Sequence, residues 1–460
     1  MKIKNSAISI YSLLVFAGLL SAGVVYAASS QASAALTIVE SVPEETEYGS
    51  QFTERPQKVW LDMINNAKKT IDFEEYYITD EEGQALSPVM DAIKKAMDRG
   101  VKVRFLVGPS FSMLKDTRKP LNELKKAGAE TAVIDFGKAY KGGVQHSKFF
   151  IVDKNSVYVG SQNFDWRSLS QIHEIGVRIQ SKRAAKDFGL IFEDDWAIAK
   201  DQEESKAESK ALSKEEKSQL SKEEKNKIKE EAKARAMAII SNKKASKPLT
   251  AKNPEEAMLN GKKVRYSLAF GPDGFVNPGL DSELSAMLNI INGAKKTISG
   301  QVMTYHLEEY GSGRWEVLDK AFRAAGERGV KVNLVFADWT MGKKKSDDDI
   351  KSLAKAKNVH IKIASLKEHS NGCIQFARVQ HSKYITADGE KSYISTSNWG
   401  PGYFNTSRGA AVVIYGAEGG RIMEDVFRKI WNGPYSALVD QDKEYQRVNR
   451  TCATEKDDQK

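Results

Sequence analysis

The chain has 460 residues and a formal net charge of +9, with 41% hydrophobic and 9% aromatic residues. This composition fits a globular protein and excludes a disordered one, and the length leaves room for two or three domains. The modest positive charge favours acidic partners without requiring nucleic acid.

Residues 1–27 are predicted to be a signal peptide. Lys2 and Lys4 form a basic start, 8–25 is mostly apolar, and Val25-Tyr26-Ala27 has the small residues of a cleavage site. A retained membrane anchor is the alternative, but Ser, Gly and Tyr interrupt the apolar stretch. We therefore expect an exported protein: periplasmic or secreted, or lysosomal or extracellular in a eukaryote.

The first half alternates predicted helices and strands, which indicates an α/β fold with helices covering a sheet. An amphipathic run precedes an apolar-aromatic run, and the next helix ends at a glycine. Two short β-rich runs joined by Lys154-Asn155-Ser156 predict a hairpin. The expected helices are 59–68, 87–98 and 121–127, and the expected strands are 70–78, 101–107, 149–153 and 157–160.

A segment of different composition separates the halves. Residues 200–235 contain 11 basic and 10 acidic side chains. Ser213 with Glu216 matches a helix capping box, and the pattern recurs eight residues later. Because the charges alternate in sign, we predict an exposed helical insert or linker, in preference to a partner-binding element.

The second half repeats the order of the first. The sequence of 65–71, for example, recurs with few changes at 292–298. The duplication predicts two similar α/β lobes packed as a pseudo-dimer around one shared active site. The expected parts after the signal peptide are a first lobe at 37–198, the charged insert at 199–248, a second lobe at 249–440 and a polar tail at 441–460.

The chain has two cysteines, Cys373 and Cys452. An oxidising compartment permits a disulfide between them, but their spacing does not determine whether they meet. Two cysteines alone do not make a metal site.

One longer motif occurs in each half. Residues 145–163 and 380–398 share His-x-Lys, an Asp five residues after the Lys and an Asn fifteen residues after it. A lone His-x-Lys arises by chance, whereas two long copies in one register indicate a duplicated site. The motif residues are His146, Lys148, Asp153 and Asn163 in the first copy and His381, Lys383, Asp388 and Asn398 in the second.

These residue types fit the hydrolysis of a phosphodiester. One neutral imidazole can attack phosphorus, while the second, protonated, donates to the leaving oxygen. The lysines and asparagines can hold the phosphoryl oxygens, so we expect no metal and no cofactor. On an extended segment His and Lys share one face, which directs both at the phosphate. Asp153 and Asp388 are assigned to structural hydrogen bonds, because a carboxylate would repel the phosphate.

With these motifs the chain resembles the phospholipase D superfamily of phosphodiesterases. Segments 38–43, 163–169, 301–305 and 396–399 are similar to its animal lysosomal branch, and the resemblance covers most of 37–440. Those relatives look like single-strand exonucleases that act from the 5′ end, so the resemblance implies single-stranded DNA or RNA as substrate. No stable protein partner is implied. Other branches act on phospholipid headgroups, and a phospholipase D is the alternative. Intact motifs in both halves argue against a binding protein with a degenerate site.

The resemblance also makes the two halves unequal. Glu174 lies 28 residues after His146, an offset at which family members carry a carboxylate that orients the histidine, whereas Gly409 has that place after His381. This implies that Glu174 supports His146, with His146 as the nucleophile and His381 as the acid. Ser395 is a second departure, because the first half has Gly160 there.

Aromatic residues near the motifs are candidate platforms for bases, and each stacked base contributes about 1–3 kcal/mol. Core packing is the alternative for each of them. We predict substrate contacts for Trp166, Trp399 and Tyr305, and the same group includes Tyr76, Tyr77 and Tyr403. The remaining histidines are expected at the surface or in packing: His173, His306, His360 and His369.

Overall fold

The computed structural model describes residues 34–109, 115–211, 221–309 and 313–452. The expected signal peptide and the capping box at Ser213 therefore lie outside the described residues. Among the helices in the described part, none is long and apolar enough to cross a membrane.

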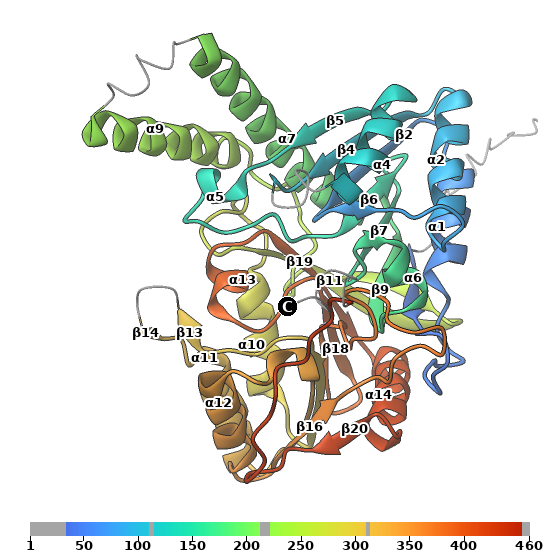
Figure 1. Ribbon diagram of the computed structural model, residues 1–460, viewed down its shortest axis with the longest axis vertical. Helices are drawn as coiled ribbons and strands as arrows, with labels where there is room; N and C mark the ends of the chain where they lie inside the picture. Colours follow the sequence, from blue (N-terminus) through green and yellow to red (C-terminus); the bar gives the residue numbers. More distant parts are fainter. Residues whose placement is uncertain (1–33, 110–114, 212–220, 310–312, 453–460) are drawn as a thin grey trace, which may run out of the picture. The chain divides into compact units, whose positions relative to one another are not determined.

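The first lobe alternates strands and helices as its sequence predicts, and it is coloured blue to green in Figure 1. Buried apolar positions recur along α1 and α2, so each helix covers the sheet with one face. Its main strands are β1 (Ala34–Ser41), β2 (Thr70–Glu75), β4 (Lys102–Val107), β5 (Glu130–Val133), β6 (Phe149–Val152), β7 (Ser156–Gly160) and β9 (Glu174–Gln180). Its helices include α1 (Pro56–Asn65), α2 (Ser87–Asp98), α4 (Lys115–Lys126), α6 (Trp166–Ser170) and α7 (Lys182–Ala211).

The second lobe, coloured yellow to red in Figure 1, repeats this order. Its strands include β10 (Glu255–Leu259), β11 (Lys262–Gly271), β12 (Thr297–Val302), β15 (Lys331–Ala337), β16 (Val359–Ala364), β17 (Tyr384–Ala387), β18 (Lys391–Ser395), β19 (Gly409–Tyr415) and β20 (Ser436–Leu438). Its helices include α10 (Glu283–Gly293), α11 (Val317–Glu327), α12 (Lys344–Ala354), α13 (Pro401–Asn405) and α14 (Ala417–Asn432).

The two lobes share a hydrogen-bonded sheet. Within the described residues its strand order is β20-β16-β15-β12-β17-β18-β19-β11-β10-β1-β9-β7-β6-β2-β4-β5. The lobes join where β1 pairs in parallel with β10, at Ala34–Ala257 and Leu36–Leu259. One large hydrophobic core contains side chains of both lobes, including Ile38, Val177 and Val412. This shared core fixes the position of one lobe against the other.

The charged insert is helical where the structure describes it. Helix α7 begins inside the first lobe, where Phe188 and Phe192 are buried, and continues into the insert. Helix α9 (Lys222–Ser241) follows, with a capping box between Ser221 and Glu224. The two helices extend beyond the sheet in Figure 1 and contact each other through Arg235, whose Nε lies 2.9 Å from an oxygen of Asp201.

The motif aspartates hold turns, as the sequence predicts. Asp153 follows β6 with a positive φ of 52°, a backbone conformation that Asp tolerates. Its carboxylate accepts hydrogen bonds from the backbone N–H groups of Lys68, Lys69 and Thr70, at 2.8, 2.6 and 3.0 Å. Asp388 makes the same three bonds with 295–297. The repeated Ala-Lys-Lys-Thr segments are therefore the backbone partners of the motif aspartates.

A disulfide joins Cys373 to Cys452, with 5.7 Å between their Cα atoms. It ties the C-terminal segment to the loop that leads into the second motif. The same contact is reinforced by a hydrogen bond from Phe376 N to the carbonyl of Arg450, at 2.7 Å. The pairing that the sequence left open is thus present.

Replacing Asp153 with Ala is expected to destabilise the fold without impairing the chemistry. Three backbone donors lose their acceptor, and we expect the free energy of unfolding to fall by about 1–3 kcal/mol. Urea unfolding measures this change. Asp153→Asn, which keeps one acceptor oxygen and the tolerance for positive φ, serves as the matched control and should lose less. Lost turnover per folded molecule at unchanged stability would contradict the structural role.

Candidate active site

Each motif histidine is held in place by backbone hydrogen bonds to the opposite lobe. The His146 N–H donates to the carbonyl of Arg408 at 3.1 Å, and the Arg408 N–H donates to the carbonyl of Val144 at 3.0 Å. The second lobe repeats the exchange: the His381 N–H donates to the carbonyl of His173 at 2.9 Å. The two motifs therefore meet at the lobe boundary, in segments that lead directly into β6 and β17.

The side chain between His and Lys points away from the histidine in both motifs, as the spacing predicts. Ser147 Oγ donates to Glu74 at 2.7 Å, and Ser382 Oγ lies 2.9 Å from Nδ1 of His173. His173 is fully buried and its Nε2 lies 3.1 Å from Glu40, so it is the packing histidine that we expected.

Glu174 supports the opposite histidine from the one expected. Its Oε2 lies 2.9 Å from Nδ1 of His381, so the expectation that it supports His146 is wrong. Glu174 begins β9, directly after the backbone exchange between His173 and His381, and this register directs its side chain across the boundary. The assignment of His146 as nucleophile thereby loses its basis.

The pairing with Glu174 changes the charge balance of His381. Burial lowers the pKa of His381 and Lys383 lowers it further, whereas the charge and hydrogen bond of Glu174 raise it. With Nδ1 occupied by the carboxylate, Nε2 is the nitrogen left to face a substrate. A positive charge formed on this ring is stabilised by Glu174.

His146 has a different environment. Its Nδ1 is buried and makes no hydrogen bond of normal geometry within the described part of the chain, although the Thr396 backbone lies close enough to raise the pKa of the ring. The rings of Tyr76 and Tyr403 lie beside it, each with its centroid 4.9 Å from the imidazole. Burial lowers the pKa of His146 well below its usual value, and the charges of Lys148 and Lys383 lower it further. An anion bound beside this ring would raise that pKa again.

Both motif lysines are fully buried, and each Nζ donates to the carbonyl of its own motif histidine at 2.5 Å. Burial lowers the pKa of Lys148 to about 7, although the charges of Glu75, Glu174 and Glu283 raise it. Burial also lowers the pKa of Lys383 well below its usual value. A phosphodiester between them would favour the charged form of both lysines. The site is thus a desolvated arrangement of two amino groups whose charged forms a bound anion would stabilise.

The motif asparagines are buried at the same boundary, with exposed fractions of 6% for Asn163 and 2% for Asn398. Asn398 Oδ1 accepts a hydrogen bond from the Thr304 N–H at 3.4 Å, so the amide NH₂ of Asn398 points away from Thr304. Asn163 Oδ1 lacks a partner within the described part of the chain. The Asn398 side chain is also within hydrogen-bonding reach of the Tyr403 hydroxyl. An amide NH₂ at either position can donate to a phosphoryl oxygen.

Two of the three predicted base platforms belong to the core of the second lobe. Trp399 is fully buried, and Tyr305 is 1% exposed with its hydroxyl 3.1 Å from Asp319. A ring enclosed on both faces cannot stack on a base, so these two predictions are wrong. The tyrosines beside His146, Tyr76 and Tyr403, are half-buried and lie next to the reacting centre.

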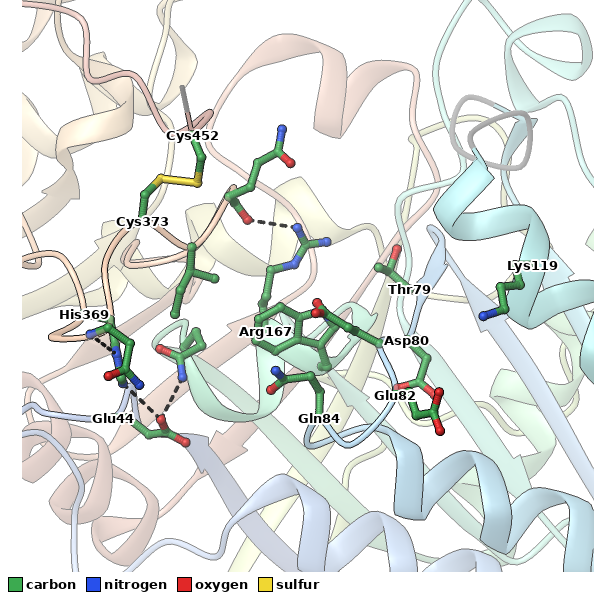
Figure 2. Close-up of a pocket in the computed structure, with 16 residues that line it drawn as sticks. Glu44, Thr79, Asp80, Glu82, Gln84, Lys119, Arg167, His369, Cys373 and Cys452 are labelled. Atoms are coloured by element: carbon green, nitrogen blue, oxygen red, sulfur yellow. Dashed lines mark hydrogen bonds and ion pairs between the residues drawn. A yellow bond between two sulfur atoms is a disulfide. The ribbon is translucent and has the colours of Figure 1, made fainter. Parts of the chain in front are cut away.

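Trp166, the third predicted platform, lies at a separate cavity of about 870 Å³. The cavity is acidic, since Asp80 and Glu82 line it, and in Figure 2 Arg167 lies between these residues and the disulfide. The Arg167 guanidinium is itself neutralised by Asp165, at 2.7 Å. An acidic cavity repels a phosphate backbone, and Trp166 is only 8% exposed. Trp166 lines this cavity, and its assignment as a substrate contact stays a prediction.

Sequence reasoning missed two buried glutamates that influence this site. Glu75 ends β2, is 2% exposed, and its charge raises the pKa of Lys148. Glu283 begins α10 and has the same effect on that lysine. Consecutive acids at 74–75 within an apolar strand were a signal for the first. Glu283, as a first-turn helix acid after a serine, looked like ordinary helix capping.

A family model described as "Cardiolipin synthase, PLD-like domain" matches residues 60–196 and 287–431, once in each lobe. "Phospholipase D Z" of Dictyostelium discoideum is 29% identical over 88% of this chain and 90% of its own length. "5'-3' exonuclease PLD3" of Xenopus laevis is 29% identical over 87% of this chain and 80% of its own length.

A phosphatidylserine synthase from Haemophilus influenzae has a similar structure, with a TM-score of 0.56. It is 12% identical, and the match covers 83% of this chain and 84% of that one. At this identity the likeness concerns the fold, and it extends over both lobes.

Proposed function

The chain belongs to the phospholipase D superfamily, an assignment that makes it a phosphodiester-hydrolysing enzyme, and we propose that it acts on single-stranded nucleic acid through a covalent phosphohistidine. The observation that carries the proposal is the meeting of the two motifs at the lobe boundary, where each motif histidine is hydrogen-bonded to the backbone of the other lobe. The charges of Lys148 and Lys383 both lower the pKa of His146, so lysines from both motifs lie near the same histidine.

In this proposal His381 is the nucleophile. Its Nε2 attacks phosphorus, the bond from phosphorus to the leaving oxygen breaks, and His146 gives that oxygen its proton. His146 then takes a proton from water, the water oxygen attacks phosphorus, and the bond to His381 breaks. Glu174 stabilises the positive charge on the His381 ring while the covalent intermediate exists, and this support is the reason for the assignment.

For His146 to act as an acid, it must carry a proton when the substrate is bound. Burial and the lysine charges oppose this in the free site. The bound phosphodiester brings a negative charge that offsets both lysines, and the His146 pKa rises with it. Protonation of His146 is thereby coupled to the presence of substrate.

The choice of nucleic acid over lipid rests on two observations. A relative that aligns over most of this chain is named as a 5'-3' exonuclease. In addition, the rings of Tyr76 and Tyr403 lie beside the histidine that would face the leaving oxygen, where a base could stack. The name of the Dictyostelium relative supports the alternative, in which the enzyme hydrolyses or exchanges phospholipid headgroups.

We also propose that the protein works outside the reducing cytosol. The first 27 residues have the pattern of a signal peptide. The disulfide between Cys373 and Cys452 fits an oxidising compartment.

A substrate panel tests the proposed specificity. We expect labelled single-stranded oligonucleotides with a free 5′ end to be shortened from that end, and phosphatidylcholine vesicles to be left intact. Gel electrophoresis and released choline report the two activities under the same conditions. Lys383→Ala removes the charge of one motif and provides the inactive control. Headgroup release without cleavage of the oligonucleotides would establish the lipid alternative instead.

The covalent intermediate tests the assignment of the histidines. With bis(p-nitrophenyl) phosphate the leaving group needs no proton, so His146→Ala should still form the adduct but lack the base that releases it. We expect the phosphoryl group to accumulate on His381, and His381→Ala to form no adduct. Quenching in alkaline denaturant, which preserves phosphohistidine, and peptide mass spectrometry give the site. An adduct on His146 in the His381→Ala protein would reverse the roles.

A further inference from the structure

The second lobe departs from the first at two positions, Ser395 in place of a glycine and Gly409 in place of a glutamate. Both positions face the same buried side chain, Glu283, which begins α10 and is 1% exposed. Glu283 Oε1 accepts hydrogen bonds from the Ser395 hydroxyl and, at 3.0 Å, from Tyr393. Its Oε2 accepts one from Ser397 at 2.9 Å. The two departures therefore belong to one cluster.

Gly409 is required by this cluster. A Cβ atom built at 409 would come within 2.3 Å of Glu283 Oε2 and within 2.3 Å of Ser397 Oγ. A side chain at 409 and the buried Glu283 therefore exclude each other. In the first lobe the carboxylate belongs to strand β9, as Glu174. In the second lobe the corresponding residue is Gly409, and the carboxylate beside it comes from helix α10, as Glu283.

Glu283 holds the segment that faces His146. Its partners Ser395 and Ser397 flank Thr396 in the sequence. The backbone of Thr396 lies close enough to the His146 ring to raise the pKa of that histidine. The next residue along is Asn398, one of the two motif amides. The Ser397 N–H also donates to Ser395 Oγ at 2.8 Å, which closes the segment on itself. The Glu283 carboxylate thus holds the short segment 395–398, which includes both Thr396 and the motif residue Asn398.

Burial raises the pKa of Glu283 to about 7, and the hydrogen bonds from Ser395, Ser397 and Tyr393 lower it. A carboxylate buried at this depth needs such donors to remain charged. Its charge reaches the reacting centre, since it raises the pKa of Lys148.

We propose that Glu283 is a positioning residue for the acid–base histidine. It acts through Ser395 and Ser397 to hold the backbone of Thr396 against the His146 ring, in place of the direct carboxylate contact that His381 receives from Glu174. The inference rests on the proposed function, because it assigns Glu283 to the half of the site that protonates the leaving oxygen.

The test compares two phosphodiesters that differ in their need for that proton. A thymidine dinucleotide has a poor leaving group, whereas bis(p-nitrophenyl) phosphate has one that leaves without protonation. Glu283→Gln should lower kcat/KM for the dinucleotide about tenfold or more, a loss typical of residues that orient a reacting side chain. The rate of the first nitrophenolate burst should change much less. The ratio of the two rates is the readout, because a general loss of folded protein leaves it unchanged.

Two further variants make the test specific. Ser395→Gly removes one link to Glu283 and restores the residue of the first lobe, so it should shift the ratio in the same direction by a smaller factor. Glu424→Gln is the matched control, since Glu424 is a partly buried carboxylate that accepts a hydrogen bond from Ser299 at 3.2 Å in the same lobe. It should leave the ratio unchanged.

The outcomes separate the inference from the proposed function. If the wild-type protein cleaves neither ester, the proposed function fails. If it cleaves both and Glu283→Gln slows them equally, or slows neither, the positioning role is overturned. A reduced dinucleotide rate with an intact burst, in a variant that melts as the Glu424→Gln control does, supports it.

Discussion

The reciprocal backbone pairing at the lobe boundary is the constraint on which the site depends. His146 pairs with Arg408, and His381 with His173, so the residue just before a strand of the other lobe fixes the position of each motif histidine. The Arg408 side chain reinforces this boundary through a buried ion pair with Asp195, at 2.6 Å. Because backbone hydrogen bonds fix both position and orientation, neither lobe alone places its own histidine.

Burial at this boundary determines the electrostatics. The lysines lie in the interior, where their charges are costly, and glutamates from both lobes surround them. A substrate phosphate would bring the negative charge that this preorganised arrangement stabilises. The two histidines then differ in support: a carboxylate contacts His381 directly, whereas His146 faces a backbone segment and two tyrosine rings.

Local patterns predicted much of this structure. The helices and strands followed from periodicity, and the Asp153 turn followed from the argument that a carboxylate would repel the phosphate. The partner of Glu174 could not be predicted, because an offset of 28 residues does not say across which boundary a side chain points. The role of Glu283 could not be predicted for a similar reason. Its side chain lies next to Gly409 only because α10 packs on the sheet. Trp399 and Tyr305 were misassigned because closeness to a motif in sequence does not distinguish a platform from a core residue.

The central claim is that the two lobes form one phosphate site. The most direct measurement is a crystal structure of the protein with bound orthovanadate or tungstate, which mimic the phosphoryl group. The account predicts a single oxyanion in contact with the imidazoles of His146 and His381 and with the amino groups of Lys148 and Lys383. Two oxyanions, each bound by one motif alone, would contradict it.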